Sequence, residues 1–275
     1  SSDLNIRELK QTVQNGGRAY GTLVVSNSPH WPNSMKNAGL DFVFLDTEHI
    51  VRNEETLAWM CCAYGAAGLA PIVRIPSPDP YTASKAIDGG AAGIVAPYVE
   101  TVDQVQALRG AVKLKPLKGK RLERVLREEE PLEPELEEYL RCRNENTLLL
   151  VNIESTPAIQ NLDEILRVAD LDGILIGPHD LSCSLGIPER YEHARFTDAL
   201  KTIIDKTRDR GLIAGMHTIN CGPVSLVLEW LRMGLNLHIM EADLVYAGRG
   251  LGQDLRTIQQ ELGEEAKIQN DQIIV

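Results

Sequence analysis

The sequence predicts an α/β fold of the (β/α)₈ TIM barrel class, and three observations support this prediction. Eight short apolar runs of strand length recur along the chain, segments with helical spacing separate them, and the runs are apolar on both faces. Strands that are buried on both faces and separated by helices form a parallel sheet covered all round. Eight such units in about 250 residues fit a closed barrel better than an open doubly wound sheet.

The elements follow one another in regular alternation. The predicted strands are Tyr20–Val25, Phe42–Asp46, Ile72–Ile75, Gly93–Pro97, Leu148–Ile153, Gly173–Ile176, Leu212–Met216 and Leu237–Met240. The predicted helices are Glu54–Ala67, Ala83–Gly89, Val102–Val112, Ala158–Val168, Ala199–Arg210 and Val224–Met233, with Gly, Pro or Asn near their ends. A Rossmann-like or flavodoxin-like sheet stays open as an alternative. No GxGxxG follows any strand, however, which weakens the case for a dinucleotide site.

Composition excludes several classes of function. The chain has 275 residues, with 28 Lys and Arg against 39 Asp and Glu, and its net charge of −11 argues against binding to nucleic acid or an anionic membrane. No run of roughly 18 apolar residues exists, and the opening residues resemble no signal peptide. The five cysteines show no CxxC spacing and predict reduced thiols. We therefore expect a cytoplasmic protein.

The longest gap between predicted strands lies between the fourth and the fifth. Residues 113–127 hold seven Lys or Arg, and the acidic segment Glu128–Glu138 follows them. A solvated loop and helix is one interpretation of this pattern, and an insertion that covers substrate or contacts another subunit is the alternative. No Ser/Gly-rich linker divides the chain, so residues 1–275 are expected to form one barrel domain.

Charged residues gather where the predicted strands stop, which is the end of a barrel that holds the chemistry. Asp46, Glu48 and His49 follow the second strand, Arg74 ends the third, Glu154 follows the fifth and Asp180 follows the sixth. The sequence therefore predicts that carboxylates, one guanidinium and one imidazole converge at one mouth of the barrel.

Glu154 and Asp180 each have a structural and a functional interpretation. Glu154 could favour the start of the next helix through its charge, and Asp180 could cap the helix that follows it. On neighbouring strands, however, the two carboxylates would repel each other unless a positive charge lay between them. A hard divalent cation such as Mg²⁺ or Mn²⁺ suits all-oxygen ligation and is the economical explanation.

Arg74 and His49 also leave two interpretations open. A buried guanidinium needs anionic partners, so Arg74 either forms a salt bridge with Asp46 or Glu48 or clamps a carboxylate or enolate oxygen of a ligand. His49 lies three residues after Asp46, which could orient its ring as a general base, or it only caps the local chain.

Four further residues are candidates for contact with a ligand. Gly177 and Pro178 provide room for backbone N–H groups to approach a carboxylate. His179 is either a residue of a surface loop or a ligand. His217, near the end of the seventh strand, either faces the site or forms only loop hydrogen bonds.

Five segments together carry a resemblance to a known family: LDTEH, VRIP, DGGAAGIVAPYVET, LVNIESTPAIQNLDEIL and LDGILIGPHDLSCSLG. From about Gly21 to Gly252 the chain resembles the HpcH/HpaI aldolase family, which includes 2-dehydro-3-deoxyglucarate aldolase. These are metal-dependent class II pyruvate aldolases that cleave 4-hydroxy-2-oxo acids into pyruvate and an aldehyde. The resemblance implies a barrel of the pyruvate/phosphoenolpyruvate-binding type.

The resemblance also implies a role for each candidate residue. It puts Glu154 and Asp180 on a divalent cation, Mg²⁺ or Mn²⁺ with Co²⁺ as a further candidate, and pyruvate chelating that ion. It implies that Arg74 binds the keto or enolate oxygen, and that His49 is the acid/base with Asp46 and Asp88 as partners. The residues implied to hold the substrate carboxylate are Gly177, Pro178, His179 and Asp180.

Two departures from the family pattern concern the aldehyde half of the site. The stretch PLKGKRLERVLREEEPLEP lacks the later glycines of relatives, and the eighth strand ends in MEAD where a GSD-like loop is common. An aldolase is thus the leading function, with an oxaloacetate decarboxylase or related enolate-forming enzyme as the alternative. A catalytically silent binding barrel is the alternative from another class.

The resemblance further implies a homo-oligomer, a hexamer or trimer of dimers, that exchanges C-terminal helices from about residue 251. The apolar-striped segment Leu251–Leu262 is compatible with this.

Overall fold

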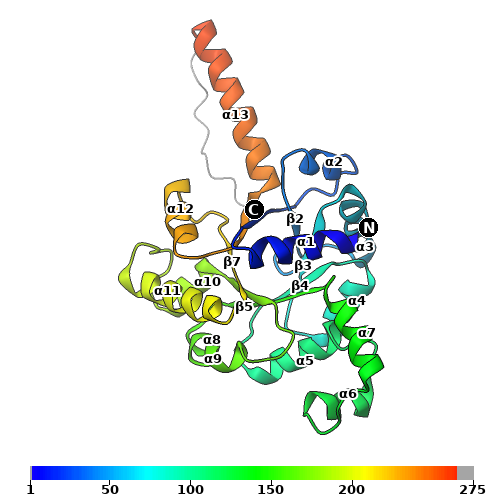
Figure 1. The fold of residues 1–275 in the computed structure, drawn as a ribbon. Helices are drawn as coiled ribbons and strands as arrows, with labels where there is room; N and C mark the ends of the chain where they lie inside the picture. The colour runs from blue at the N-terminus through cyan, green and yellow to red at the C-terminus, as the bar shows by residue number, and fades with distance from the viewer. Residues whose placement is uncertain (1, 265–275) are drawn as a thin grey trace.

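The protein is a closed barrel of eight parallel strands in a computed structural model that describes residues 2–264 (Figure 1). The strands pair in sequence order, and β1 closes the barrel against β8. They are β1 (Ala19–Leu23), β2 (Phe42–Asp46), β3 (Ala70–Arg74), β4 (Gly93–Ala96), β5 (Leu148–Ile153), β6 (Gly173–Ile176), β7 (Ile213–His217) and β8 (Leu237–Ala242). The predicted barrel class is confirmed.

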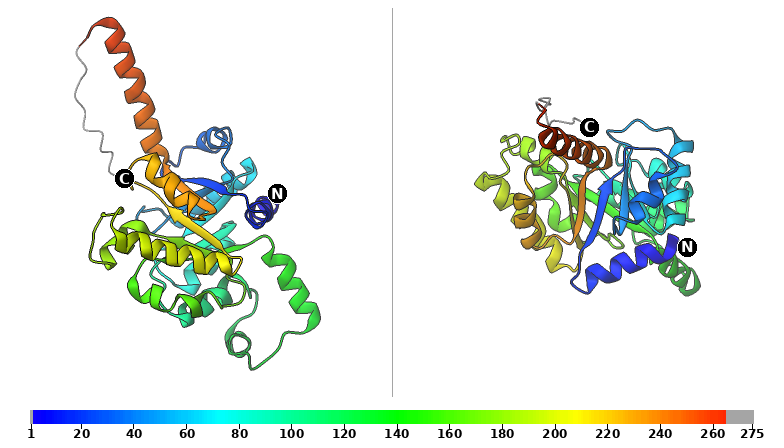
Figure 2. Two further views of the ribbon diagram at one scale, coloured as in Figure 1. Left: turned by 60° about the vertical axis from the view of Figure 1, so that its left-hand side comes forward. Right: turned by 90° about the horizontal axis from the view of Figure 1, so that it is seen from above.

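Helices surround the sheet, as Figure 2 shows from two further directions. In chain order they are α1 (Ser2–Gln14), α2 (Trp31–Lys36), α3 (Glu54–Ala67), α4 (Pro80–Asp88), α5 (Val102–Val112), α6 (Gly119–Leu126), α7 (Pro134–Asn144), α8 (Thr156–Gln160), α9 (Leu162–Ile165), α10 (Pro178–Ser184), α11 (Ala194–Asp209), α12 (Val224–Arg232) and α13 (Asp243–Leu262). The helix predicted over 158–168 forms as two short helices, because Asn161 ends α8 and begins α9.

The apolar strands bury side chains on both faces, as the sequence predicted. One cluster fills the barrel and includes Phe42, Phe44 and Leu150, while a second lies between the sheet and the helices. Helix α1 places Ile6 and Leu9 in the interior cluster and so covers the amino-terminal end of the barrel. The carboxyl-terminal end is left for the site.

The charged insertion forms its own small unit at the amino-terminal end. Helix α5 ends at Val112 and β5 begins at Leu148, so the excursion between them starts and finishes at that end. Its helices α6 and α7 bury Leu114, Val125 and Leu140 against each other. The interpretation that this segment covers substrate in its own barrel is therefore wrong, because the carboxyl-terminal mouth lies at the opposite end.

Helix α13 follows β8 and projects away from the barrel, as Figure 1 and the left view of Figure 2 show. It exposes large apolar side chains along its length, namely Leu244, Tyr246, Leu251, Leu255, Ile258 and Leu262. The predicted exchange segment from about 251 is described as far as residue 264, and residues 265–275 lie outside the described residues. Among the residues described, none of the helices combines the length and the apolar character needed to span a membrane.

Candidate active site

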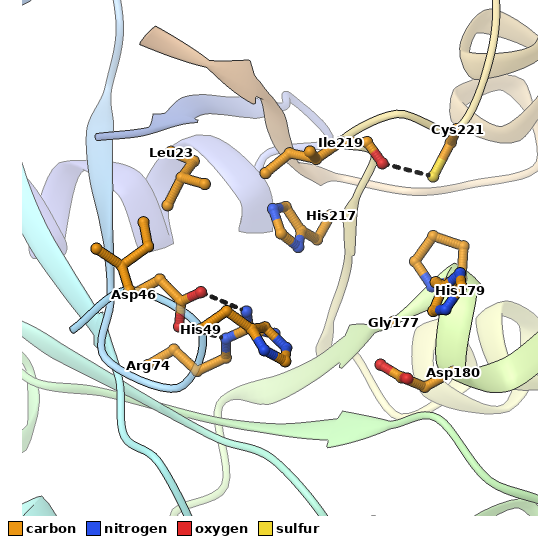
Figure 3. A pocket seen from close by; sticks show the side chains of 12 residues that line it. Leu23, Asp46, His49, Arg74, Gly177, His179, Asp180, His217, Ile219 and Cys221 are labelled. Atoms are coloured by element: carbon orange, nitrogen blue, oxygen red, sulfur yellow. Dashed lines mark hydrogen bonds and ion pairs between the residues drawn. The ribbon is translucent and has the colours of Figure 1, made fainter. Parts of the chain in front are cut away.

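A cavity of about 370 Å³ opens at the carboxyl-terminal ends of the strands (Figure 3). Residues from β1, β2, β3 and β7, from the loops after strands and from the start of α10 line it. They are Leu23, Asp46, His49, Ile50, Arg74, Gly177, Pro178, His179, Asp180, His217, Ile219 and Cys221. The candidate residues after the second, third and sixth strands therefore meet in one cavity, as the strand-end argument predicted.

Arg74 is held on the cavity wall by two acids. Strands β2 and β3 pair in a register that sets Asp46 directly opposite Arg74. Nε and Nη2 of Arg74 donate to the two Asp46 oxygens at 2.9 and 2.6 Å, and Nε lies 3.1 Å from a Glu48 oxygen. Among the residues described, Nη1 of Arg74 has no hydrogen-bond partner. The guanidinium is thus fixed in place with one nitrogen left over.

The electrostatics of this pair favour its charged form. Burial alone would raise the pKa of Asp46, but the hydrogen bonds and charge of Arg74 hold it below its ordinary value. Burial alone would lower the pKa of Arg74, and Asp46 and Glu48 raise it instead. Both groups stay ionised, so the salt bridge that the sequence left as an alternative does form.

Asp46 does not partner His49 in this structure, which corrects the predicted pairing. Arg74 occupies both oxygens of Asp46, and one of them also accepts the Glu48 backbone N–H. The acid beside His49 is Glu48, whose oxygen lies 3.6 Å from Nε2. The His49 side chain is 61% exposed at the mouth, where a substrate can reach it.

Glu154 and Asp180 approach each other across Gly177. A side-chain carbon at Gly177 would lie 2.8 Å from a Glu154 oxygen and 3.7 Å from an Asp180 oxygen, so only glycine leaves this space open. Asp180 lines the cavity, and Glu154 is buried beside it. Burial raises the pKa of Glu154, and the negative charges of Asp180 and Glu48 add to this rise.

The cap predicted for Asp180 does not form, because Gly177 is the N-cap of α10 and Asp180 lies inside its first turn. Ser155, the residue after Glu154, caps helix α8. Glu154 instead accepts from the Tyr98 backbone N–H at 2.8 Å and from Asn152 Nδ2 at 2.7 Å.

The carboxylate pair fits a hard divalent cation. Among the described residues, neither Glu154 nor Asp180 forms an ion pair, and Arg74 acts on Glu154 only as a more distant charge. No group of three or more His, Cys, Asp or Glu side chains gathers as a metal cluster in the part of the chain described. Mg²⁺ in particular is commonly held by one or two carboxylates, with water and substrate oxygens completing its shell. Two carboxylates beside an open cavity meet that requirement.

The remaining predicted residues have different fates. His179 lies on the rim, 61% exposed and 3.6 Å from Glu189. Asp88 is the last residue of α4, which runs back to the amino-terminal end, and there it pairs with Lys115. Asp88 therefore lies away from His49 of its own chain, and the prediction that it partners His49 is wrong within this barrel. The glycine after it, Gly89, is the C-cap of α4.

Two residues of the site, Tyr98 and Asn152, were not predicted from the sequence. Tyr98 lies two residues after the end of β4 and has a positive φ of 55°, a conformation that is unusual for a residue with a side chain. Its backbone holds Glu154, and hydrogen bonding to Glu48 raises the pKa of its phenol to about 12. The strand-end rule would have found Tyr98 if applied to all polar residues, whereas Asn152 lies inside the apolar fifth strand.

A parallel eight-stranded barrel with an arginine, a histidine and a carboxylate pair at its carboxyl-terminal mouth defines an enzyme of the (β/α)₈ class. The sequence model of the HpcH/HpaI aldolase/citrate lyase family matches residues 20–225. The chain belongs to this family, which confirms the resemblance, and it is an enzyme of the carbon–carbon lyase class.

Known proteins resemble it along nearly the whole length. The 2-keto-3-deoxy-L-rhamnonate aldolase of Shigella boydii serotype 4 is 28% identical over 250 residues, or 90% of this chain and 91% of the relative. The crystal structure of citrate synthase SbnG has a TM-score of 0.76 at 29% identity and covers 93% of this chain and 98% of its own. An HpcH/HpaI aldolase from Desulfitobacterium hafniense DCB-2 has a TM-score of 0.76 at 22% identity, with coverage of 91% and 96%.

Proposed function

We propose that this enzyme is a divalent-metal-dependent aldolase that cleaves or forms 4-hydroxy-2-oxo acids, with pyruvate and an aldehyde as the other partners. The observation that carries the proposal is the pair Glu154 and Asp180, which approach each other across Gly177 without a cationic partner, facing the fixed Arg74. Glu154 and Asp180 would hold the ion, Mg²⁺ or Mn²⁺ by preference. When bound, the cation would polarise the 2-oxo group of the substrate.

Arg74 and His49 would carry out the remaining steps, which are charge stabilisation and proton transfer. Arg74 points its charge at the oxygen where negative charge grows, and Asp46 and Glu48 fix it beforehand, so little reorganisation is needed. His49, at the exposed mouth, takes the proton of the 4-hydroxyl, directly or through water. The C3–C4 bond then breaks, the aldehyde leaves, and its electron pair stays on the three-carbon enolate, which becomes pyruvate on protonation at C3.

The substrate carboxylate has donors at the start of α10. Gly177 and Pro178 bring the chain to the cavity, and Pro178 itself has no N–H. The amides of His179 and Asp180 lie in the first helical turn, where backbone N–H groups lack partners within the helix. We assign the carboxylate of the 2-oxo acid to these amides.

The deciding experiment measures pyruvate release from a panel of 4-hydroxy-2-oxo acids with Mg²⁺, Mn²⁺ or Co²⁺, and after EDTA. Activity should disappear on chelation, return with metal, and fall by on the order of 10³ in Glu154→Gln. Glu100→Gln, which alters an acid near Ser155 outside the cavity lining, is the matched control and should keep its activity. Full activity after exhaustive chelation, or trapping of a pyruvate adduct by borohydride, would overturn the proposal.

A second candidate function is favoured by the likeness to citrate synthase SbnG. The same Arg74 and carboxylate pair would serve another enolate reaction, such as decarboxylation of oxaloacetate or addition of an enolate to a 2-oxo acid. An enzyme that decarboxylates oxaloacetate with metal but releases no pyruvate from any 4-hydroxy-2-oxo acid would favour this second candidate.

Helix α13 supports a homo-oligomer. Its exposed apolar side chains, such as Leu251 at 74% and Leu262 at 68%, leave a long uncovered surface away from the barrel. We propose that a second copy of the chain covers this helix, in a hexamer or trimer of dimers built on the single barrel domain. Sedimentation should give a mass well above 30.4 kDa, and Leu251→Glu with Leu255→Glu should lower it.

The cysteines support a reducing compartment. All five are free in the structure, including the adjacent Cys61 and Cys62. Reduced thiols are usual in the cytoplasm and unusual outside the cell, so we assign the enzyme to the cytoplasm.

A further inference from the structure

The loop that carries His49 is held to the barrel at only a few points. It connects β2 to α3, and its first two residues, Thr47 and Glu48, donate hydrogen bonds to β2 and β3. In the part of the chain that the structure describes, no backbone group of residues 49–52 forms a hydrogen bond. A fixed position for His49 at the mouth therefore requires support from side chains.

The side chain of Arg52 provides such support by tying this loop to the neighbouring one. Arg52 lies three residues after His49, and its Nη2 donates to the carbonyl oxygens of Val24 and Val25, which follow β1. Its Nη1 donates to the sulfur of Met60, a fully buried residue of α3. The guanidinium thus bridges from the loop after β2 to the loop after β1.

Asp243 fixes the loop after β1 from the other side. It is the first residue of α13 and is 3% exposed. One of its oxygens accepts the N–H of Val25 at 2.9 Å, and the other accepts the N–H of Ser26 at 3.1 Å and the indole N–H of Trp31. The carbonyl groups of this loop are therefore bound by Arg52, and its N–H groups are bound by Asp243.

Charge strengthens this arrangement. Burial lowers the pKa of Arg52, and the negative charges of Asp243 and Asp46 oppose this effect. A guanidinium keeps its charge in proteins, and hydrogen bonds from a charged donor are stronger than those from a neutral one. Arg52 is therefore a firmer tether for the loop than a neutral side chain would be.

We propose that Arg52 is a positioning residue that keeps His49 within reach of the substrate's 4-hydroxyl, and that Asp243 anchors the loop to which Arg52 binds. This inference rests on the proposed aldolase function. The His49 side chain is 61% exposed, so packing alone does not fix it. Proton transfer requires heavy atoms about 3 Å apart, and a displacement of about 1 Å is costly. Because Asp243 begins α13, the same contacts link His49 to the start of that helix.

The test compares two reactions of one enzyme sample with Mg²⁺. Aldol cleavage needs the proton transfer assigned to His49, whereas decarboxylation of oxaloacetate does not. The ratio of their kcat values, taken with the 4-hydroxy-2-oxo acid that wild type cleaves fastest, does not depend on the fraction of folded protein. Arg52→Met, which keeps an apolar stem without a donor, should lower this ratio by about tenfold and leave KM nearly unchanged. Arg52→Lys keeps one charged donor and should recover part of the loss.

A double-mutant cycle tests whether Arg52 acts through His49. His49→Ala removes the group that is positioned, so Arg52→Met should not lower the ratio further in that background. Asp243→Asn loses the charged acceptor of the Val25 and Ser26 amides. It should lower the ratio in the wild-type background and leave it unchanged in His49→Ala.

Arg18→Met is the matched control. Arg18 also donates to two backbone carbonyls, those of Leu231 and Leu235 at 3.3 Å each, but it precedes β1 at the amino-terminal end. Arg18→Met should lower the melting temperature and leave the ratio unchanged.

A wild-type ratio in Arg52→Met or in Asp243→Asn would overturn this inference while the aldolase function stands. A further fall of the ratio when Arg52→Met is added to His49→Ala would do the same. A wild-type enzyme that decarboxylates oxaloacetate with Mg²⁺ but cleaves no 4-hydroxy-2-oxo acid would overturn the proposed function, and this inference with it.

Discussion

The two ends of the barrel both bury charged residues, but they use them differently. At the amino-terminal end Lys113 is 1% exposed, and its Nζ lies 2.6 Å from an oxygen of Asp172 and from the Thr147 carbonyl. Lys10 reaches the other Asp172 oxygen at 2.7 Å, and the Leu149 N–H also donates to this carboxylate. Each charge in this cluster has its partners within the chain.

The carboxyl-terminal end holds a similar set of charges that is incomplete. His217 Nε2 is buried without a hydrogen bond, and neither Glu154 nor Asp180 forms an ion pair among the described residues. Buried charge that is fully paired supports the fold, whereas buried charge with unmet requirements beside a cavity indicates a ligand. The following predictions separate these two roles.

The largest effect on stability is expected from Asp172→Asn. It leaves Lys113 and Lys10 close together without their shared acid, and breaking a buried ion pair typically costs about 3–5 kcal/mol. Urea unfolding should show this loss in the free energy of unfolding, while kcat per folded molecule stays unchanged. Asp163→Asn, which breaks the surface pair with Lys206, should have no measurable effect. A large fall in kcat of folded Asp172→Asn would mean that the charges at the amino-terminal end also serve catalysis.

Arg74→Ala tests the opposite end. Losing one preorganised charged donor typically costs on the order of 10²–10³ in kcat, and this loss should appear both in aldol cleavage and in decarboxylation of oxaloacetate. Arg74→Lys should recover only part, because lysine lacks the two-pronged geometry that holds Arg74 to Asp46. If folded Arg74→Ala spared either reaction, Arg74 would have only a structural role.

His49→Ala should slow aldol cleavage much more than decarboxylation of oxaloacetate. Aldol cleavage requires removal of the 4-hydroxyl proton and should slow by about 10² or more, whereas decarboxylation has no such proton and should change little. Both rates are measured at one metal concentration. Equal impairment of the two reactions would assign His49 to the enolate instead of to the hydroxyl.

The smallest expected effect is a difference between wild type and Lys113→Met in how stability depends on pH. Burial lowers the pKa of Lys113 to about 8 from 10.5, so between these values the unfolded chain binds more protons than the folded one. The cost of burying this charge is therefore present below pH 8 and disappears as the pH rises to 10.5. Between pH 8 and pH 10.5 the free energy of unfolding of wild type should therefore rise, relative to that of Lys113→Met, by on the order of 1–3 kcal/mol. A constant difference would contradict the shift.

The same contrast explains what could be predicted from the sequence. Apolar runs on both faces specify the strands of a parallel barrel, and a polar residue at a run's end marks the mouth, so Asp46, Arg74 and Asp180 were found. The rule identifies a neighbourhood but not a pairing. The β2–β3 register, which no sequence pattern displays, assigned Asp46 to Arg74 instead of to His49.

Other features were out of reach for similar reasons. Tyr98 holds Glu154 through its backbone N–H, which every residue type possesses. Asp88 resembled a site residue by its surroundings in sequence, but the direction of α4 carries it to the opposite end. Helices α6 and α7 were not foreseen individually, because their apolar residues meet only each other and charges dominate the segment.

If the carboxyl-terminal end of the barrel is a metal-assisted site for forming the pyruvate enolate, the enzyme should exchange the methyl protons of pyruvate with solvent whatever the aldehyde is. Pyruvate is incubated in D₂O with Mg²⁺, and loss of its methyl proton signal is followed by NMR. We expect exchange by wild-type enzyme that stops with EDTA and falls by on the order of 10³ in Glu154→Gln. Exchange that persists at the wild-type rate after chelation, or in folded Glu154→Gln, would contradict it.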